Sequence, residues 1–266
     1  MSKISKNGRV YGLKPSLPDH RNHTFSLVNE DISAIPPMVD LRTTGFMPPV
    51  WDQGALGACT AHGIGAAWAY ERAKQKLPFQ MPSRLFIYYN ERDMEGSVNS
   101  DSGAAIADGL KVVNKFGVPE ENIFPYVPEQ FTVRPPQQAY DLAIKETAVS
   151  YASVPVNLTS IKGVLASGFP VVIGLTLYSS FEENSVAATG LVPMPQHNEE
   201  ILGGHCLLVA GFSDKGFPGI PNSANHFLVR NSWNTTWGDK GYCYIPYAYF
   251  NSQLASDFWC IKMVKA

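Results

Sequence analysis

The sequence predicts an α+β fold in which a mainly helical first half meets a mainly stranded second half. In the first half, apolar residues recur at helical spacing, as in Ile106, Leu110 and Val113. In the second half they alternate, as in residues 171–177, which is typical of strands. A chain of 266 residues can bury a core as one large domain or as two lobes. We therefore expect two lobes that meet along a cleft.

Four helices are predicted in the first half. The first runs from Cys59 to about Lys76 and ends before Pro78, and Ser83 is placed to cap the second. The third opens after Asp101, with Gly117 at its carboxyl end. The expected ranges are 59–76, 84–94, about 103–116 and 137–145.

Strands dominate the second half, after a short helix that ends near Gly168. A long loop over residues 179–202 separates the first expected strand from the second. The expected strands are residues 171–177, 206–212, 226–231, 241–245 and 258–264.

Composition indicates a globular chain and excludes several classes of protein. Hydrophobic residues make up 45% and charged residues 17%, which is typical of a folded chain. A net charge of −2 favours neither nucleic acid nor an anionic membrane as a partner. No apolar run approaches the ~18 residues that span a bilayer. Residues 1–25 lack the apolar segment of a secretory signal, so we expect a cytoplasmic protein or one exported by a non-classical route.

Four cysteines are too few for a disulfide scaffold, and no cluster of cysteines and histidines has metal-ligand spacing. We therefore expect neither a metal nor another cofactor. Cys206 follows His205 on a predicted strand, so it faces the opposite side and is expected in the core. Cys243 and Cys260 lie in late strands, and we expect them unpaired because the sequence shows no sign of export.

Cys59 is the candidate nucleophile. The stretch Gln53-Gly-Ala-Leu-Gly-Ala-Cys-Thr60 delivers it to the start of the first helix. Backbone N–H groups and the positive end of the helix dipole meet a thiol there and stabilise its thiolate form. A lone cysteine is more often a core residue, so this interpretation depends on two later stretches.

Those stretches are Gly203-Gly204-His205-Cys206-Leu-Leu-Val-Ala-Gly-Phe212 and Val229-Arg-Asn231-Ser-Trp233-Asn-Thr-Thr-Trp-Gly-Asp-Lys-Gly-Tyr242. Cysteine, histidine and asparagine occur in that order, with 146 positions from Cys59 to His205, a spacing typical of papain-like enzymes. The three stretches together resemble the signatures of the papain family of cysteine peptidases.

This resemblance covers residues 38–264 and implies a helical lobe at about 50–150 and an antiparallel sheet or barrel lobe at about 151–250. The termini would cross between the lobes of a peptidase domain over residues 38–266. The implied activity is cysteine-type endopeptidase cleavage through a thioester acyl-enzyme. Cys59 would be the nucleophile and His205 the acid and base. Asn231 would orient that ring, and Gln53 would donate to the oxyanion.

Three positions depart from the family pattern. Thr60 follows the nucleophile where the best-known members have an aromatic residue, and Leu56 stands where many secreted members have a second cysteine. This favours a bacterial-type branch without the family disulfides. Asn234 replaces a glycine, and asparagine adopts a positive φ more readily than most residues.

The resemblance also implies a substrate-binding set. Ser102 and Gly103 would pair with the substrate backbone, and Gly204 and Trp233 would line the cleft beside the histidine. Either Ser256 or Asp257 would close the main specificity pocket, and the sequence leaves that choice open. An acidic residue there would favour basic side chains, and a small neutral residue would favour apolar ones. The histidine pair of an occluding loop is not evident, which favours an endopeptidase.

Residues 1–37 are predicted to be an extended arm without a helix, because prolines punctuate them. We hypothesise that residues 11–25 pack across the cleft and restrain activity. A surface arm without a regulatory role is the alternative. The expected partners are therefore a peptide or protein substrate and the chain's own arm.

Alternative assignments remain at this stage. His62 lies on the same helix as Cys59 but has no third group to orient it, and His197 lies in the long loop as a candidate for the cleft wall. An inactive papain-fold binding protein is one alternative. Such a protein would need none of Gln53, Cys59, His205 and Asn231, so the presence of all four argues against it. Another Cys-His acyl-transfer enzyme, such as a transglutaminase or amidase, would more often use an aspartate as the third member.

Overall fold

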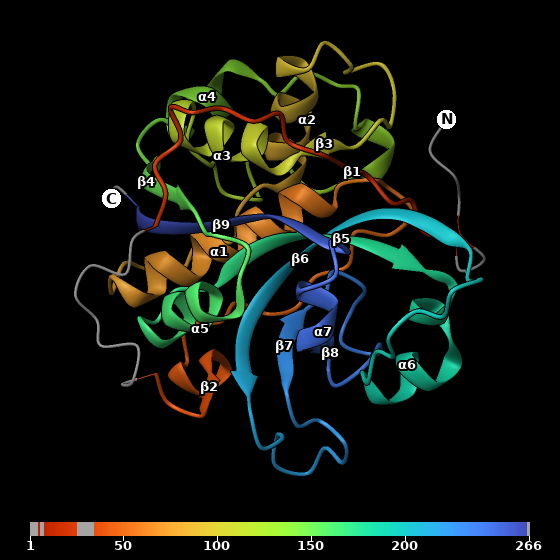
Figure 1. Cartoon of the computed structure of the whole chain (residues 1–266). Helices are drawn as coiled ribbons and strands as arrows, with labels where there is room; N and C mark the ends of the chain where they lie inside the picture. The colour runs from red at the N-terminus through yellow and green to blue at the C-terminus, as the bar shows by residue number, and fades with distance from the viewer. Residues whose placement is uncertain (1–4, 6–7, 26–34, 265–266) are drawn as a thin grey trace.

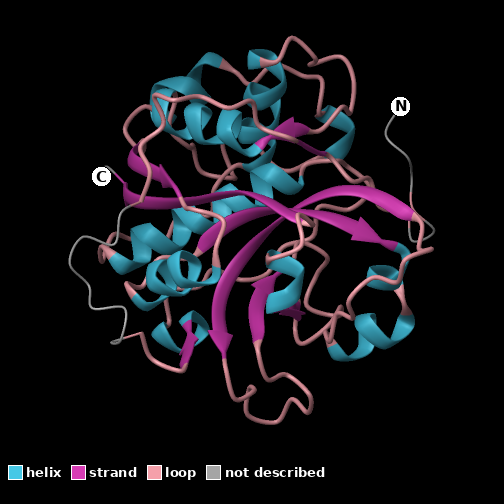
Figure 2. Cartoon of the chain, viewed as in Figure 1, coloured by secondary structure: helices cyan, strands magenta, loops and turns pink. Residues whose placement is uncertain are grey.

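One antiparallel sheet and the helix that begins at Cys59 organise the fold (Figure 1). The computed structural model describes residues 5, 8–25 and 35–264. Helices gather on one side of the sheet, and further short helices lie at its other face and its end (Figure 2). This arrangement confirms the predicted α+β class.

The helices of the first half have sharply defined ends. The Ser83 hydroxyl accepts a hydrogen bond from the Phe86 N–H at 3.2 Å and caps α2. Beyond α3, Gly117 has a φ of 78°, a left-handed conformation that glycine adopts without strain. The structure confirms the predicted helices to within about three residues at each end. Their bounds are α1 Cys59–Lys74, α2 Arg84–Met94, α3 Ile106–Lys115 and α4 Gln137–Ala143.

The large sheet has the strand order β4-β9-β5-β6-β7-β8, with β2 paired to β6, and every pairing within it is antiparallel. Its ends, β4 and β8, do not pair with each other, so the described part of the chain forms an open sheet. The bounds are β2 Met38–Asp40, β4 Ala148–Ser153, β5 Val171–Tyr178, β6 Ile201–Ser213, β7 His226–Arg230, β8 Tyr242–Pro246 and β9 Ala255–Val264.

The structure corrects the sequence prediction at short or irregular elements. Strand β6 begins at Ile201, so His205 lies within the strand and not ahead of it. The expected loop 179–202 contains the 3-10 helix η4 and α6. Such elements span less than two helical turns, so they leave no apolar period in the sequence. Further short elements are η2 Leu41–Thr44, η3 Pro128–Gln130, α5 Leu158–Ala166, η4 Ser179–Glu182, α6 Asn184–Thr189 and α7 Tyr247–Phe250.

Strands β5 and β6 are buried on both faces. Val172, Cys206 and Leu208 pack into one apolar cluster with α1, α2 and α3. Val171 and Val209, on the opposite face, pack into a second cluster with α5. This alternation follows the two-residue period of a strand. Cys206 is therefore a core residue, as predicted, and all four cysteines are free and buried.

Helix α1 approaches β6 closely at Gly63. A Cβ added at this glycine would lie 2.9 Å from the Cys206 Sγ atom, which is closer than atoms normally pack. Cys59 lies one helical turn before Gly63 on the same helix. The absent side chain at Gly63 therefore sets how close the start of α1 comes to the strand that carries His205.

The N-terminal arm lies against both halves of the fold. Its strand β1 (Leu13–Lys14) pairs in parallel with β3 (Ala104–Ala105), next to α3. Farther along, Thr24 bridges Ser153 of β4, so the red segment of Figure 1 runs from β3 to β4. The described part of the arm has no helix, as predicted. Residues 1–4, 6–7 and 26–34 of the predicted arm lie outside the described residues.

Within the described ranges, no helix is both long and apolar enough to cross a membrane.

Gly63→Ala tests the close packing of α1 on β6. We expect this substitution to lower the free energy of unfolding by about 1–3 kcal/mol, because the added methyl group forces α1 and β6 apart. Urea denaturation of the full chain measures the change. Gly65→Ala on the same helix is the control, since its nearest neighbour, Pro82, would lie 3.3 Å away. Equal losses in the two variants would contradict a special constraint at Gly63.

Candidate active site

The loop before Cys59 is tied to the segment that carries Asn231. Asp52 forms an antiparallel bridge with Trp233, and the Gln53 N–H donates to the Ser232 carbonyl at 2.9 Å. The Ser232 hydroxyl also donates to the Gln53 Oε1 atom at 2.5 Å. Two parts of the chain that lie far apart in sequence are thereby held as one wall of the site.

His205 and Asn231 form the oriented pair that the sequence predicts. The His205 Nε2 atom lies 2.9 Å from the Asn231 Oδ1 atom. The Trp233 ring stacks on the imidazole with centroids 5.2 Å apart, and both side chains are buried. The indole therefore lies over the ring that makes this hydrogen bond. Within the described chain, the His205 Nδ1 and Asn231 Nδ2 atoms have no hydrogen-bond partner.

Cys59 is the first residue of α1 and is fully buried. Burial raises the pKa of its thiol to about 11, although backbone hydrogen bonds with Cys206 and Gly12 oppose the rise. Burial and, to a smaller extent, the nearby Arg9 charge lower the pKa of His205 to about 4, although its hydrogen bond with Asn231 opposes the fall. Both groups are therefore neutral near pH 7 while the arm covers them.

The arm crosses the site from His205 to β3. Tyr11 lies with its ring centroid 5.7 Å from that of His205, and its hydroxyl donates to the Glu182 carboxylate. The Gly12 carbonyl accepts a hydrogen bond from the Ala104 N–H at 2.8 Å. A Cβ added at Gly12 would lie 1.9 Å from the Gly57 carbonyl oxygen, so glycine permits this approach.

Gln53 presents its side-chain amide to the arm. Its Nε2 atom donates to the Leu56 carbonyl at 3.0 Å and reaches the Val10 carbonyl at 3.4 Å. A carbonyl group of the arm thus lies near the position where we expect an oxyanion donor to act.

All four predicted substrate-binding residues contact the arm. A Cβ added at Gly103 would lie 1.8 Å from the Gly12 carbonyl oxygen, and one at Gly204 would lie 2.8 Å from that of Leu13. The Trp233 ring lies 6.2 Å from the Tyr11 ring between centroids. Ser102 Oγ lies 3.0 Å from the Lys14 Nζ atom. The arm therefore lies along the predicted groove.

Comparisons with known proteins agree with this arrangement. The family model described as papain family cysteine protease matches residues 35–258.

The chain belongs to the papain family of cysteine proteases.

Individual relatives support this assignment. The crystal structure of xylellain, a cysteine protease from Xylella fastidiosa, has 38% sequence identity and a TM-score of 0.87, covering 100% of this chain and 99% of that one. A peptidase C1-like protein of Acanthamoeba polyphaga mimivirus, itself named as uncharacterized, is 39% identical over 99% of this chain and 89% of its own length. Digestive procathepsin L 3 of Tenebrio molitor, at 17% identity and a TM-score of 0.68, shares the fold and covers 96% of this chain and 74% of its own.

The Leu13 side chain of the arm lies against Gly174 of β5, next to Ser256. A Cβ added at Gly174 would lie 2.6 Å from the Leu13 Cδ2 atom and 3.4 Å from the Ser256 Oγ atom. Asp257 instead accepts a hydrogen bond from the Ser16 N–H at 2.8 Å. Of the two residues that the sequence left open, Ser256 therefore lies at Gly174 with Leu13, and Asp257 contacts the arm farther along, at Ser16.

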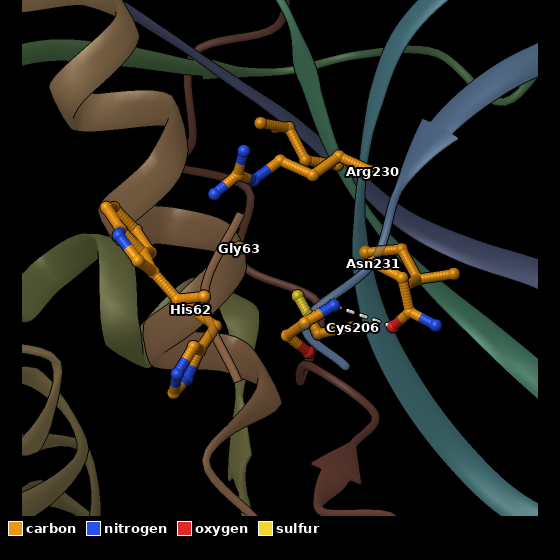
Figure 3. Close-up of a pocket in the computed structure, with 9 residues that line it drawn as sticks. His62, Gly63, Cys206, Arg230 and Asn231 are labelled. Atoms are coloured by element: carbon orange, nitrogen blue, oxygen red, sulfur yellow. Dashed lines mark hydrogen bonds between the residues drawn. The ribbon is translucent and has the colours of Figure 1, made fainter. Parts of the chain in front are cut away.

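The competing histidines have other surroundings. His62 Nδ1 lies 2.9 Å from the Ala58 carbonyl, and its ring packs edge-on against Tyr126. Figure 3 shows His62 on α1, across a small pocket from Asn231. Burial holds the pKa of His62 well below its usual range, so it is neutral near pH 7. His197 is exposed in the loop before β6.

Asn234 has the left-handed conformation that its glycine-like position requires, with a φ of 67°.

The sequence did not single out Leu13, Lys14 or Glu182. Only the expectation that residues 11–25 cross the cleft pointed to this part of the chain, because an extended arm has no local pattern that marks contact residues.

Gly12→Ala tests whether the arm keeps the thiol of Cys59 neutral. The added methyl group would clash with the Gly57 backbone, so we expect the arm to leave the site. A raised pKa keeps the thiol protonated at neutral pH; exposing it to water lowers that pKa from about 11 and moves the thiolate to lower pH. We expect alkylation of Cys59 by iodoacetamide at pH 8 to become at least ~10-fold faster, since each pKa unit changes the thiolate fraction about tenfold. Mass spectrometry of the Cys59 peptide across pH measures this rate.

Gly8→Ala is the control for that experiment. It lies on the same arm, and an added Cβ there would meet no atom within 4 Å, although its φ of 71° introduces local strain. We expect its alkylation profile to follow the wild-type chain. Identical profiles for the Gly12→Ala and wild-type chains would contradict the role given to the arm.

Proposed function

We propose that this papain-family protease is an endopeptidase that uses Cys59, His205 and Asn231, and that its N-terminal arm restrains it. The observation that carries the proposal is the path of residues 9–14. This segment contacts Gln53, Cys59, His205 and the whole predicted substrate groove. In this view, residues 1–37 form the arm and residues 38–266 the peptidase domain.

The catalytic cycle is an acyl transfer through sulfur. The Cys59 thiolate attacks the peptide carbonyl, and the amine leaves after it takes a proton from the His205 imidazolium. His205 then removes a proton from water, which attacks the thioester and releases the acid and the thiol. The Asn231 oxygen accepts from Nε2–H, so that ring atom keeps its proton. The Nδ1 atom, which is buried without a partner, is then the atom that exchanges the proton with sulfur.

Gln53 is the proposed side-chain donor to the oxyanion. Ser232 holds the Gln53 Oε1 atom, which turns the Nε2–H₂ group toward the site. A donor fixed in advance stabilises the charge that develops in the transition state without a cost for reorientation. The backbone N–H of Cys59, at the start of α1, is the proposed second donor.

The arm restrains this chemistry in two ways. Its backbone and the Leu13 side chain occupy the groove where a substrate would bind. It also excludes water from Cys59 and His205 and brings the Arg9 charge close, and both effects disfavour an imidazolium. Arg9 is itself held by Asp52 at 2.5 Å. Displacement of the arm is therefore the step that activates the enzyme.

The pocket filled by Leu13 favours an apolar substrate side chain. Gly174 and Gly204 leave room for a branched side chain, and Ser256 adds no charge there. An endopeptidase with this pocket would prefer leucine-like residues at that subsite.

Peptide cleavage by the full-length Gly12→Ala chain tests the proposed activity. We expect it to cleave a fluorogenic peptide library at least ~10-fold faster than the wild-type chain, because the groove is free. A second substitution, Cys59→Ala, should abolish both cleavage and labelling by an epoxide thiol inhibitor. Cleavage that persists in Cys59→Ala would contradict the nucleophile assignment. Amine incorporation without cleavage would instead indicate a transferase.

Gln53→Ala, made in the Gly12→Ala chain, tests the oxyanion donor. Loss of one such donor typically lowers kcat by about 10²–10³-fold with little change in KM. Steady-state kinetics on one peptide from the library measures both constants. Ser232→Ala is the matched control, because it removes the contact with Gln53 Oε1 but keeps the donor. If the two variants lost activity equally, Gln53 would matter because it contacts Ser232 and not because it donates to the oxyanion.

A further inference from the structure

A carboxylate lies beside the apolar pocket and binds the next side chain of the arm. The Lys14 Nζ atom lies 2.6 Å from Glu95 Oε2 and 3.0 Å from Ser102 Oγ. Lys14 pairs with Ala105 in the parallel bridge between β1 and β3. The side chain opposite Ala105 therefore reaches Glu95.

Glu95 is held in place independently of Lys14. Its second oxygen, Oε1, accepts a hydrogen bond from the Ala105 N–H at 2.8 Å. The Glu95 side chain is only 13% exposed. Ser102 in turn lies 2.9 Å from the Ser97 hydroxyl. The carboxylate is thus fixed to the same strand that pairs with the backbone in the groove, so a cation there meets a pre-oriented acceptor.

Neighbouring basic side chains are engaged elsewhere. Arg92 donates to the carbonyls of Val98 and Ser100 at 2.7 and 3.2 Å. Lys111 pairs with Asp108 at 2.8 Å. Once the arm leaves, Glu95 therefore loses the cation that Lys14 supplies, and the partly buried charge favours replacement by another cation.

The register joins this carboxylate to the apolar pocket. The residue opposite Ala104 is Leu13, which fills the space at Gly174, and the residue opposite Ala105 is Lys14. Adjacent residues of a bound chain would therefore be recognised by different chemistry, one by shape and one by charge.

We propose that Glu95 is a specificity-determining residue that selects substrates with a lysine or arginine next to the aliphatic residue in the Leu13 pocket. This inference rests on the proposed peptidase function. Glu95 acts on selectivity because a neutral substrate side chain leaves its oriented carboxylate without a cation.

The full-length Gly12→Ala chain provides the test. A library of internally quenched peptides, read by mass spectrometry, first identifies the cleavage sites. We expect lysine or arginine beside a leucine-like residue. A matched pair of peptides then differs only in lysine or norleucine at that position, which removes the charge and keeps the length of the chain. We expect kcat/KM to favour the lysine peptide by about tenfold or more.

Glu95→Gln should bring that ratio to within about twofold. The substituted amide keeps an oxygen for the Ala105 N–H, so the strand contact is preserved. Asp93→Asn is the control, since Asp93 is an exposed acid in the last turn of α2, two residues before Glu95, and lines a different pocket. It should keep the wild-type preference. Equal cleavage of the two peptides, or a preference that survives Glu95→Gln, would overturn the inference while leaving the peptidase function intact.

A second measurement does not depend on cleavage. In the otherwise wild-type chain, Lys14→Met and Glu95→Gln should each speed alkylation of Cys59, because each weakens the arm at the same contact. The double variant should then be no faster than the faster single variant. Fully multiplicative effects would show that the two side chains act separately, and would overturn the inference even if no peptide were cleaved.

Discussion

The close contact between α1 and β6 is the constraint on which the rest of the site depends. Helix α1 presents Cys59, and strand β6 presents His205, so their relative position follows from the packing at Gly63 and Cys206. Gln53 and Ser232 make a second connection between the loop before α1 and the segment after β7. The close approach at Gly63, beside the small pocket of Figure 3, leaves little freedom for either element to shift alone. The proposed pairing of the Cys59 thiol with the His205 imidazole therefore depends on how these two elements pack.

In the proposed mechanism, the arm restrains Cys59 and His205 by excluding water as well as by occupying the groove. Charged groups are disfavoured where water is excluded, and the proposed reaction requires a Cys59 thiolate and a His205 imidazolium. A segment that carries Tyr11 over His205 and Gly12 over Cys59 favours the neutral pair, as the pKa shifts of both residues indicate. In the account proposed here, Cys59 and His205 are restrained when the arm shields them from water, and they become active when the arm leaves and water reaches them.

Sequence reasoning was most successful where one residue type has a narrow physical role. Glycines and capping residues marked the ends of the helices. Cys59, His205 and Asn231 could be singled out because each lies in a sequence stretch that resembles a papain-family signature, and the three stretches occur in the family's order. Asn234 adopts the predicted left-handed turn for the same reason. Short helices such as α6 were missed because they are too brief to show a period. Leu13, Lys14 and Glu95 were missed because their importance comes from the register between β1 and β3, which joins residues some 90 positions apart.

Nitrogen-15 NMR of His205 in the full-length Gly12→Ala chain is the most direct test of the central claim, that Cys59 and His205 become a thiolate–imidazolium pair when the arm leaves. At pH 7, the account predicts a charged His205 ring in this variant, a neutral ring in the wild-type chain, and a return to the neutral ring when Cys59 is also replaced by alanine. A His205 ring that stays neutral at pH 7 in the arm-displaced chain, with Cys59 present, would contradict the account.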